Sequence, residues 1–188
     1  SGIDGSQDIL CSNLGWGNME QPEVKTNEAT YGGVVIFSHM LSLFRIKIEP
    51  ENETAATQYG QISNIRITDQ PSSIKVDMID LAIEAYSALD TDYSPVGFMP
   101  VSLTANPAPV VQDAGYIMAM PARKFTVEVE TENRLWPSAE LDFTTAEHPY
   151  ATSTPGTIYD VDIKFMEAYE MQLSVTEADE WWMDSVFD

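Results

Sequence analysis

Apolar and polar residues alternate along most of the chain beyond residue 43. Alternation with a period of two places the apolar set on one face of a β-strand and the polar set in water. The apolar sets are Phe44, Ile46 and Ile48; Ile65 and Ile67; Ile74, Val76 and Met78; Phe125, Val127 and Val129; Leu141 and Phe143; Tyr159, Val161, Ile163 and Phe165; and Met171, Leu173 and Val175. The pattern predicts a series of strands that are each buried on one face.

Proline, glycine and short polar stretches separate these runs. The breakers are Pro50-Glu51-Asn52, Asp69-Gln70-Pro71, the Pro107 and Pro109 loop, and Pro155-Gly156. One-sided strands joined by short loops predict an antiparallel β-sandwich, because strands of a parallel sheet are apolar on both faces. We expect an all-β domain from about Gly33 to Trp182, closed by a C-terminal hairpin that ends in Trp181-Trp182.

The stretch Ile79 to Leu89 fits two structures. Ile79, Ala82, Ile83, Tyr86 and Leu89 form a helical stripe, whereas Ile79, Leu81, Ile83 and Ala85 form a strand pattern. The surrounding strands favour β-structure, and a single helix packed on the sandwich is the alternative.

The first thirty residues are rich in Gly, Asn, Ser and Glu, and only Asp8 to Ser12 has the character of a strand. We expect residues 1–30 to form a leader or inter-domain linker with one short strand, followed by the sandwich domain over residues 31–188. Cys11 is the single cysteine, so no disulfide can form within the chain. Leu10 is not the small residue that a lipoprotein cleavage site requires, and we interpret Cys11 as a plain strand residue. Ser1-Gly2-Ile3 is not typical of a native start, which indicates processing or truncation upstream.

The charge of the chain excludes two classes of partner. Nine Lys and Arg face 30 Asp and Glu, for a formal net charge of -21. Phosphate backbones and anionic lipid headgroups would repel such a chain, so we expect no nucleic-acid partner and no membrane-surface binding. No apolar run reaches membrane-spanning length, and hence we expect no transmembrane segment.

The usual catalytic patterns are missing from the sequence. His39 lies in a strand region and His148 precedes Pro149 in a loop, and no Gly-x-Ser-x-Gly elbow accompanies either. Two histidines and one cysteine do not give a zinc-site spacing, and Gly32-Gly33 is an isolated pair rather than a phosphate loop. We therefore predict no enzyme, no catalytic residues, no cofactor and no metal, and interpret His39 as a hydrogen-bonded strand histidine.

Two acidic segments and three tryptophans suggest binding sites. Asp90-Thr91-Asp92 and Glu177-Ala178-Asp179-Glu180 lack the pattern of a calcium loop, and we interpret both as solvated loops or turns. Trp136 and the Trp181-Trp182 pair could stack on sugars. One of the pair is expected in the core and the other exposed, because strand neighbours face opposite ways.

Four motifs in order resemble the Bacteroidetes fimbrillin-like family. Phe37 to Ile46 resembles the Phe-x-His-Ala-Leu-type strand that opens a domain of these proteins, and Ile117 to Ala122 resembles their Leu-Ile-Pro-Gln segment. Thr154 to Tyr159 and the alternation after it resemble their final hairpin, and Gln7 to Cys11 is similar to the Asp-Leu-Leu strand before the domain.

The resemblance implies a transthyretin-like sandwich with Greek-key type connections, and a role in surface fimbriae. It implies export as a lipoprotein precursor to the cell surface, at the outer membrane or fimbrium. The expected partners are other fimbrial subunits, which join by strand addition, and surface glycans or proteins of host or bacterium.

The tail Met183 to Asp188 is short for a donor strand, since about seven residues are needed to span roughly 23 Å. We therefore expect an accessory or tip subunit rather than a major stalk subunit. The alternative function is a carbohydrate-binding surface lipoprotein domain.

Overall fold

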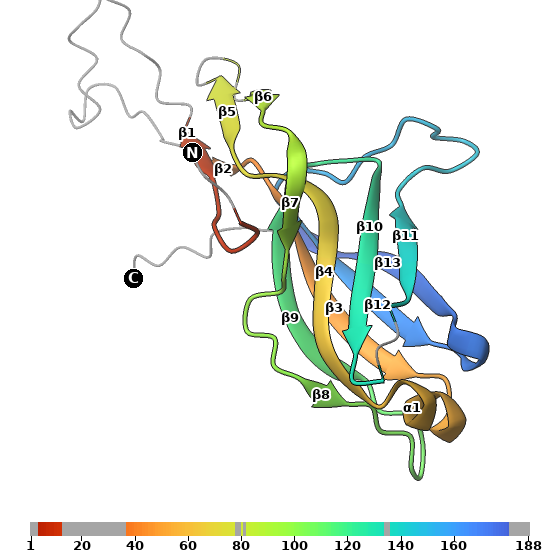
Figure 1. Cartoon of the computed structure of the whole chain (residues 1–188). Coiled ribbons are helices and arrows are strands. Elements are labelled where there is room, and N and C mark those ends of the chain that lie inside the picture. The colour runs from red at the N-terminus through yellow and green to blue at the C-terminus, as the bar shows by residue number, and fades with distance from the viewer. Residues whose placement is uncertain (1–3, 13–36, 78–79, 81, 134–135, 181–188) are drawn as a thin grey trace, which may run out of the picture.

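Two β-sheets that pack face to face make up most of the chain (Figure 1). The structure, a computed structural model, describes residues 4–12, 37–77, 80, 82–133 and 136–180. The five-stranded first sheet runs in the order β11 (Ser138–Asp142), β10 (Lys124–Thr131), β4 (Gln61–Pro71) and β7 (Leu89–Tyr93), with β8 (Val101–Ser102) also on β4. The four-stranded second sheet runs in the order β13 (Met171–Glu180), β12 (Thr157–Phe165), β3 (Ser42–Pro50) and β9 (Gln112–Ala119). The predicted all-β sandwich is confirmed.

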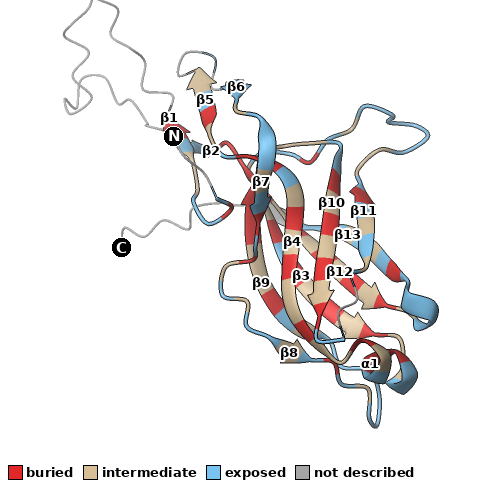
Figure 2. Cartoon of the chain, in the orientation of Figure 1, coloured by how far each residue is buried: buried red, intermediate tan, exposed pale blue. Residues whose placement is uncertain are grey.

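Burial alternates along the strands as the sequence pattern predicts (Figure 2). The inward residues of β3, β10 and β12 are buried almost completely, and their neighbours in sequence lie on the outer faces. Burying an Ile, Val or Phe side chain fully stabilises a protein by about 1.5–3 kcal/mol. The alternating residues therefore supply most of the energy that holds the sheets together.

An aromatic cluster joins the two sheets. The ring of Phe44 on β3 lies 5.0 Å from that of Phe125 on β10, in an edge-to-face arrangement. The ring of Tyr159 on β12 stacks on Phe44 at 5.7 Å and meets Phe143, which follows β11, at 5.1 Å. Such pairs add about 0.5–1.5 kcal/mol each beyond their buried area. This cluster fixes how the sheets sit on each other.

One strand pair differs from the antiparallel pattern. β12 runs parallel to β3, from Ile158 opposite Leu43 to Phe165 opposite Pro50. We expected antiparallel pairing because one face of each strand is polar. On the outer face of this pair, however, Asp160 accepts from Arg45 at 2.7 Å and from Lys47 at 2.9 Å. The charges are satisfied across the parallel pair, so one-sided burial does not decide the direction of a single strand.

The short helix α1 (Glu53–Tyr59) was not predicted. It follows β3 directly, at the breaker that we expected only to end a strand. The side-chain oxygen of Asn52 accepts from the backbone N–H of Ala55 at 2.9 Å, which caps the first turn. Gly60 ends the helix at a φ of 66°. The hydrophobic pattern does not reveal this helix, because the helix is shorter than two turns and is too short to show a helical repeat of apolar residues.

The ambiguous stretch 79–89 is β-structure where it is described. β5 (Ile74–Asp77) pairs with β6 (Ala82–Tyr86) in a hairpin, and β7 begins at Leu89. The helical alternative is therefore wrong over residues 82–86. Ile79 and Leu81 lie outside the described residues.

The predicted C-terminal hairpin is present as β12 and β13, joined through the 3-10 helix η1 (Glu167–Tyr169). Gly156 opens it at a φ of 73° and donates its N–H to the carbonyl of Leu41 at 2.9 Å. Trp181-Trp182 and the tail 183–188 lie outside the described residues. The transthyretin-like and Greek-key descriptions stay predictions.

Candidate functional site: the β9 edge and the N-terminal segment

Residues 4–12, called here the N-terminal segment, cross the end of the sandwich that lies opposite α1 (Figure 1). The carbonyl of Gly5 accepts from the N–H of Met118 on β9 at 2.8 Å, and that of Ile9 accepts from Met40 at 2.9 Å. β1 (Leu10–Ser12) then pairs antiparallel with β2 (Phe37–His39). The segment is thus bound to the domain through backbone hydrogen bonds at several points.

A contact between His39 and Asp8 adds a side-chain attachment. Nδ1 of His39 lies 2.8 Å from Oδ2 of Asp8, and the two side chains are 8% and 23% exposed. The interpretation of His39 as a hydrogen-bonded strand histidine is confirmed. His148 lies exposed in the loop after β11, as expected. The two histidines therefore lie in different parts of the fold.

Cys11 anchors the segment as an apolar residue. It lies in β1 and is only 2% exposed, which confirms its interpretation as a strand residue. Burial raises the pKa of its thiol. A buried neutral thiol packs as a small apolar group and reacts slowly, because the thiolate is the reactive form.

Gly5 makes a close approach to Tyr93 of β7. Gly5 has a φ of 85°, and a Cβ at this position would lie 2.8 Å from the Cβ of Tyr93. Tyr93 is fully buried, and its hydroxyl donates to the carbonyl of Pro71. Burial raises the pKa of the Tyr93 hydroxyl, and the nearby carboxylate of Asp4 raises it further. The N-terminal segment thus touches β7 of the first sheet and β9 of the second.

Among the described residues, the outer edge of β9 is occupied by isolated contacts rather than by a strand. β9 pairs with β3 on its inner side. On its outer side, Val96 and Tyr116 exchange backbone hydrogen bonds of 2.8 and 3.4 Å, and Met118 binds Gly5 as described above. Gly115 allows this approach, since a Cβ there would lie 2.2 Å from the carbonyl oxygen of Val96. Two separate chain stretches therefore cover an edge that a single added strand could occupy.

The edge formed by β11 and β13 is protected differently. The two strands lie close to each other across the side of the sandwich without pairing. Lys124 reaches from β10 to Glu140 and Asp142 of β11, and Glu177 of β13 is exposed. Charged side chains on edge strands discourage pairing with another chain. This contrast makes the β9 edge the better candidate for an interface.

Trp136 lies on the outer face of the first sheet. It is 53% exposed, and the guanidinium of Arg66 lies 5.5 Å from the centre of its ring. Arg66 is itself held by Glu128 at 2.6 Å and by Asp92 at 3.3 Å. Part of the ring is thus used by a cation–π contact within the chain. The interpretation of Trp136 as a sugar platform stays a prediction, and Trp181-Trp182 lie outside the described residues.

The two acidic segments do not lie in loops or turns, so that expectation was wrong. Asp90 to Asp92 lie in β7, where Asp92 pairs with Arg66, and Glu177 to Glu180 lie in β13. Tertiary pairing extended both strands beyond the apolar alternation that we used to place them. Within the described ranges, no group of three or more His, Cys, Asp or Glu is placed to hold a metal ion. In the same part of the chain, no helix has both the length and the apolar character to cross a membrane.

The chain is similar to several solved structures. A protein of Bacteroides uniformis, described as a "putative cell adhesion protein", matches with a TM-score of 0.55 at 12% identity, over 79% of this chain and 53% of that one. A fimbrial protein of Bacteroides vulgatus matches with a TM-score of 0.44 at 9% identity, over 79% of this chain and 56% of that one. Another "putative cell adhesion protein", from Parabacteroides distasonis, matches with a TM-score of 0.45 at 10% identity, over 76% and 52%.

The chain therefore has the β-sandwich fold of the Bacteroides uniformis protein, and the family resemblance seen in the sequence motifs is confirmed at the level of fold. The chain spans about half the length of each of these three solved structures. No family model matches the sequence, and no curated protein matches it.

Proposed function

We propose that this protein is a structural or adhesive component of a bacterial surface fimbria, exported to the cell surface, that joins other subunits by β-strand addition. Two observations support the proposal. The fold is that of a protein described as a "putative cell adhesion protein", and in the described part of the chain the β9 edge is covered by isolated contacts alone. The second observation carries the argument, because strand addition requires an edge whose backbone groups can exchange partners.

The N-terminal segment is the part that must move for an added strand to reach β9. Its departure would free the N–H of Met118 and the N–H of Met40, and would uncover the side of Tyr93 now covered by Gly5. Apolar surface is costly in water, and the freed backbone N–H groups would be open to new partners. A strand donated by a neighbouring subunit would bind where both are satisfied again.

The domain division and the position in the filament belong to this proposal. We propose residues 1–30 as a leader or linker and residues 31–188 as the domain that assembles, with the N-terminal segment acting as a removable cover. We place the protein as an accessory or tip subunit, exported as a lipoprotein precursor. Immunogold labelling that finds the protein along the whole length of filaments would contradict the tip position.

Deleting the gene tests the function directly. We expect surface filaments, or adhesion of the cells, to be lost on deletion and restored by the wild-type gene. Electron microscopy and an adhesion assay on the same cells measure both. Unchanged filaments and unchanged adhesion, or a protein found only inside the cell, would contradict the proposal.

A cross-strand disulfide tests the movement of the N-terminal segment. Cys11 lies directly opposite Ser38 in the β1–β2 pair, so Ser38→Cys places two thiols on facing positions. The oxidised variant should keep the segment in place and fail to join other subunits, and reduction should restore assembly. Ser38→Ala under the same oxidising conditions is the control. Equal incorporation of the oxidised variant would show that the segment need not leave.

A further inference from the structure

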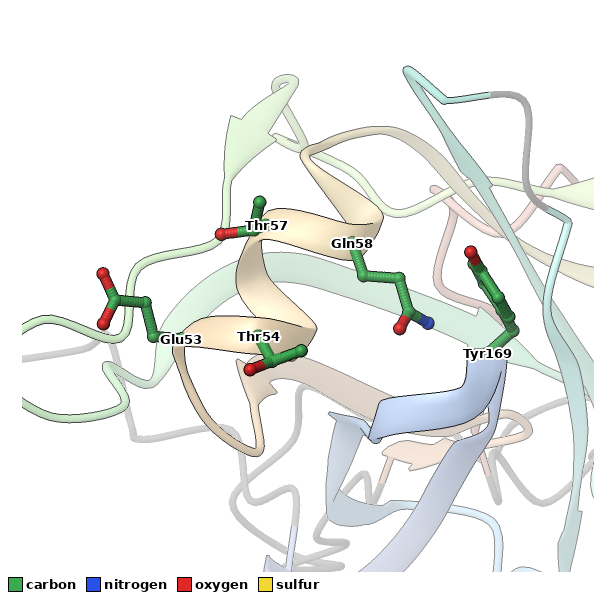
Figure 3. A pocket seen from close by; sticks show the side chains of 5 residues that line it. All are labelled: Glu53, Thr54, Thr57, Gln58 and Tyr169. Carbon is green, nitrogen blue, oxygen red and sulfur yellow. The ribbon is translucent and has the colours of Figure 1, made fainter.

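A groove lies between α1 and η1, at the end of the sandwich opposite the N-terminal segment (Figures 1 and 3). It is a shallow depression of about 550 Å³ that lies largely open to solvent. We call it the pole groove. It is lined by Glu53, Thr54, Thr57, Gln58 and Tyr169.

The main chain that presents Tyr169 is strained. Ala168 has φ 65° and ψ 23°, and Tyr169 has φ 64°, so two successive non-glycine residues lie in the left-handed region. Such strain persists only where the surroundings enforce it, and it is concentrated at ligand-binding sites. The ring of Tyr169 meets that of buried Tyr59 edge-to-face at 6.4 Å, and the side chain is still 60% exposed, so most of it faces the groove and solvent.

Hydrogen bonds from α1 and its flank fix the main chain on both sides of Tyr169. Before it, the N–H of Glu167 donates to Glu51 at 3.2 Å, and the Glu167 carboxylate accepts from Asn52 at 2.9 Å. After it, the hydroxyl of Tyr59 donates to the carbonyl of Glu170 at 2.8 Å. The main chain that carries the exposed ring is therefore fixed before any ligand arrives, which lowers the entropy cost of binding.

Gln58 supplies a polar group beside that ring. Figure 3 shows its side chain extending from α1 toward Tyr169. The amide nitrogen of Gln58 is buried, and no hydrogen-bond partner for it lies within the described ranges of the chain. Buried polar groups without partners are rare in folded proteins, and a turn of the Gln58 side chain into the groove would let an acceptor on a ligand satisfy this one.

We propose that the pole groove binds a neutral saccharide. An aromatic ring can cover the apolar C–H face of a sugar, while two hydroxyls, an amide and a carboxylate offer donors and acceptors for its hydroxyl groups. Lys and Arg are missing from the five lining residues, and the chain carries a net charge of -21, so an anionic ligand is disfavoured. The inference goes beyond assembly at β9 and uses the opposite end of the domain, so each can fail without the other.

Binding is tested with the whole chain on an array of neutral oligosaccharides, followed by NMR titration with the strongest hit. We expect Tyr169→Ala to weaken binding at least tenfold and Tyr169→Phe to change it less than threefold. Thr57→Val, which replaces a hydroxyl by a methyl group, provides a second variant that leaves the strained turn intact and should also weaken binding. Tyr150→Ala is the matched control, since Tyr150 is 75% exposed and lies over Arg123 elsewhere on the domain.

Two results would overturn the inference. One is that no neutral oligosaccharide binds at millimolar concentration in either measurement. The other is that Tyr169→Ala and Thr57→Val, both folded by NMR, bind as the wild type does. Binding lost instead in Trp136→Ala would place the sugar on the outer face of the first sheet. The assembly measured with Ser38→Cys should be the same in all pole-groove variants, which separates the two proposals.

Discussion

At the scale of single residues, glycine is required at two positions where one stretch of the chain lies very close to another. Gly5 lies against Tyr93, and Gly115 lies against the carbonyl of Val96. Both have positive φ, at 85° and 86°. A side chain at either site would meet another part of the chain as well as backbone strain. These two glycines therefore allow the N-terminal segment and Val96 to lie against the β9 edge.

We predict that Gly115→Ala destabilises the protein by about 2–4 kcal/mol, the sum of left-handed strain and the displacement of Val96. Gly97→Ala is the matched control. Gly97 has a φ of 81°, but nothing lies within 4 Å of its Cβ position, so about 1 kcal/mol of strain is expected alone. Urea unfolding measures both. Equal losses would show that contact with Val96 is not what requires glycine at 115.

At the scale of elements, α1 depends on its caps and on its contact with η1 more than on its own length. A helix of seven residues is too short to be stable alone in water. Asn52 contributes twice, by capping the first turn and by donating to Glu167. Burial of Tyr59 raises the pKa of its hydroxyl to about 12, so it stays protonated and keeps its bond to Glu170 at neutral pH.

We predict that Asn52→Ala destabilises the protein by about 1–2 kcal/mol, because one residue loses both the cap and the bond to η1. Asn52→Ser keeps a capping oxygen and should lose about half as much. Thermal and urea unfolding give the two values. A loss in Asn52→Ser as large as in Asn52→Ala would indicate that the bond to Glu167 matters and the cap does not.

At the scale of the whole molecule, charge opposes the compact state. The chain carries a net charge of -21. On the outer faces of the sheets, Arg45, Arg66 and Lys124 each lie beside a carboxylate. Asp160 is an example. Burial alone would raise its pKa, but the bonds from Arg45 and Lys47 outweigh burial and lower it. Local pairs of this kind reduce the repulsion without removing it.

We predict that adding NaCl from low ionic strength raises the melting temperature, by about 2–4 °C for each kcal/mol of repulsion screened. CaCl₂ at the same ionic strength is the comparison. An equal rise with both salts is expected if screening alone acts. A clearly larger rise with calcium would reveal specific calcium sites and contradict our prediction that the protein binds no metal.

The sequence by itself determined the alternating strands and their buried faces, but not β7, β8 or β9, where the alternation is weak or absent. Period-two alternation was sufficient for Phe44 to Ile48 and for Tyr159 to Phe165, because a strand's side chains alternate whatever its partner is. The final hairpin followed from the same pattern and from Pro155-Gly156. The motifs also indicated the fold that the Bacteroides uniformis structure shares.

The tertiary structure decided the partners. That β12 runs parallel to β3, that the N-terminal segment reaches β9, and that Tyr169 stands beside Gln58 all join residues far apart in the chain. Alternation reports which face of a strand is buried but carries no information on direction or neighbour. Both candidate sites, the β9 edge and the pole groove, arise from such long-range contacts, which is why neither could be located from the sequence.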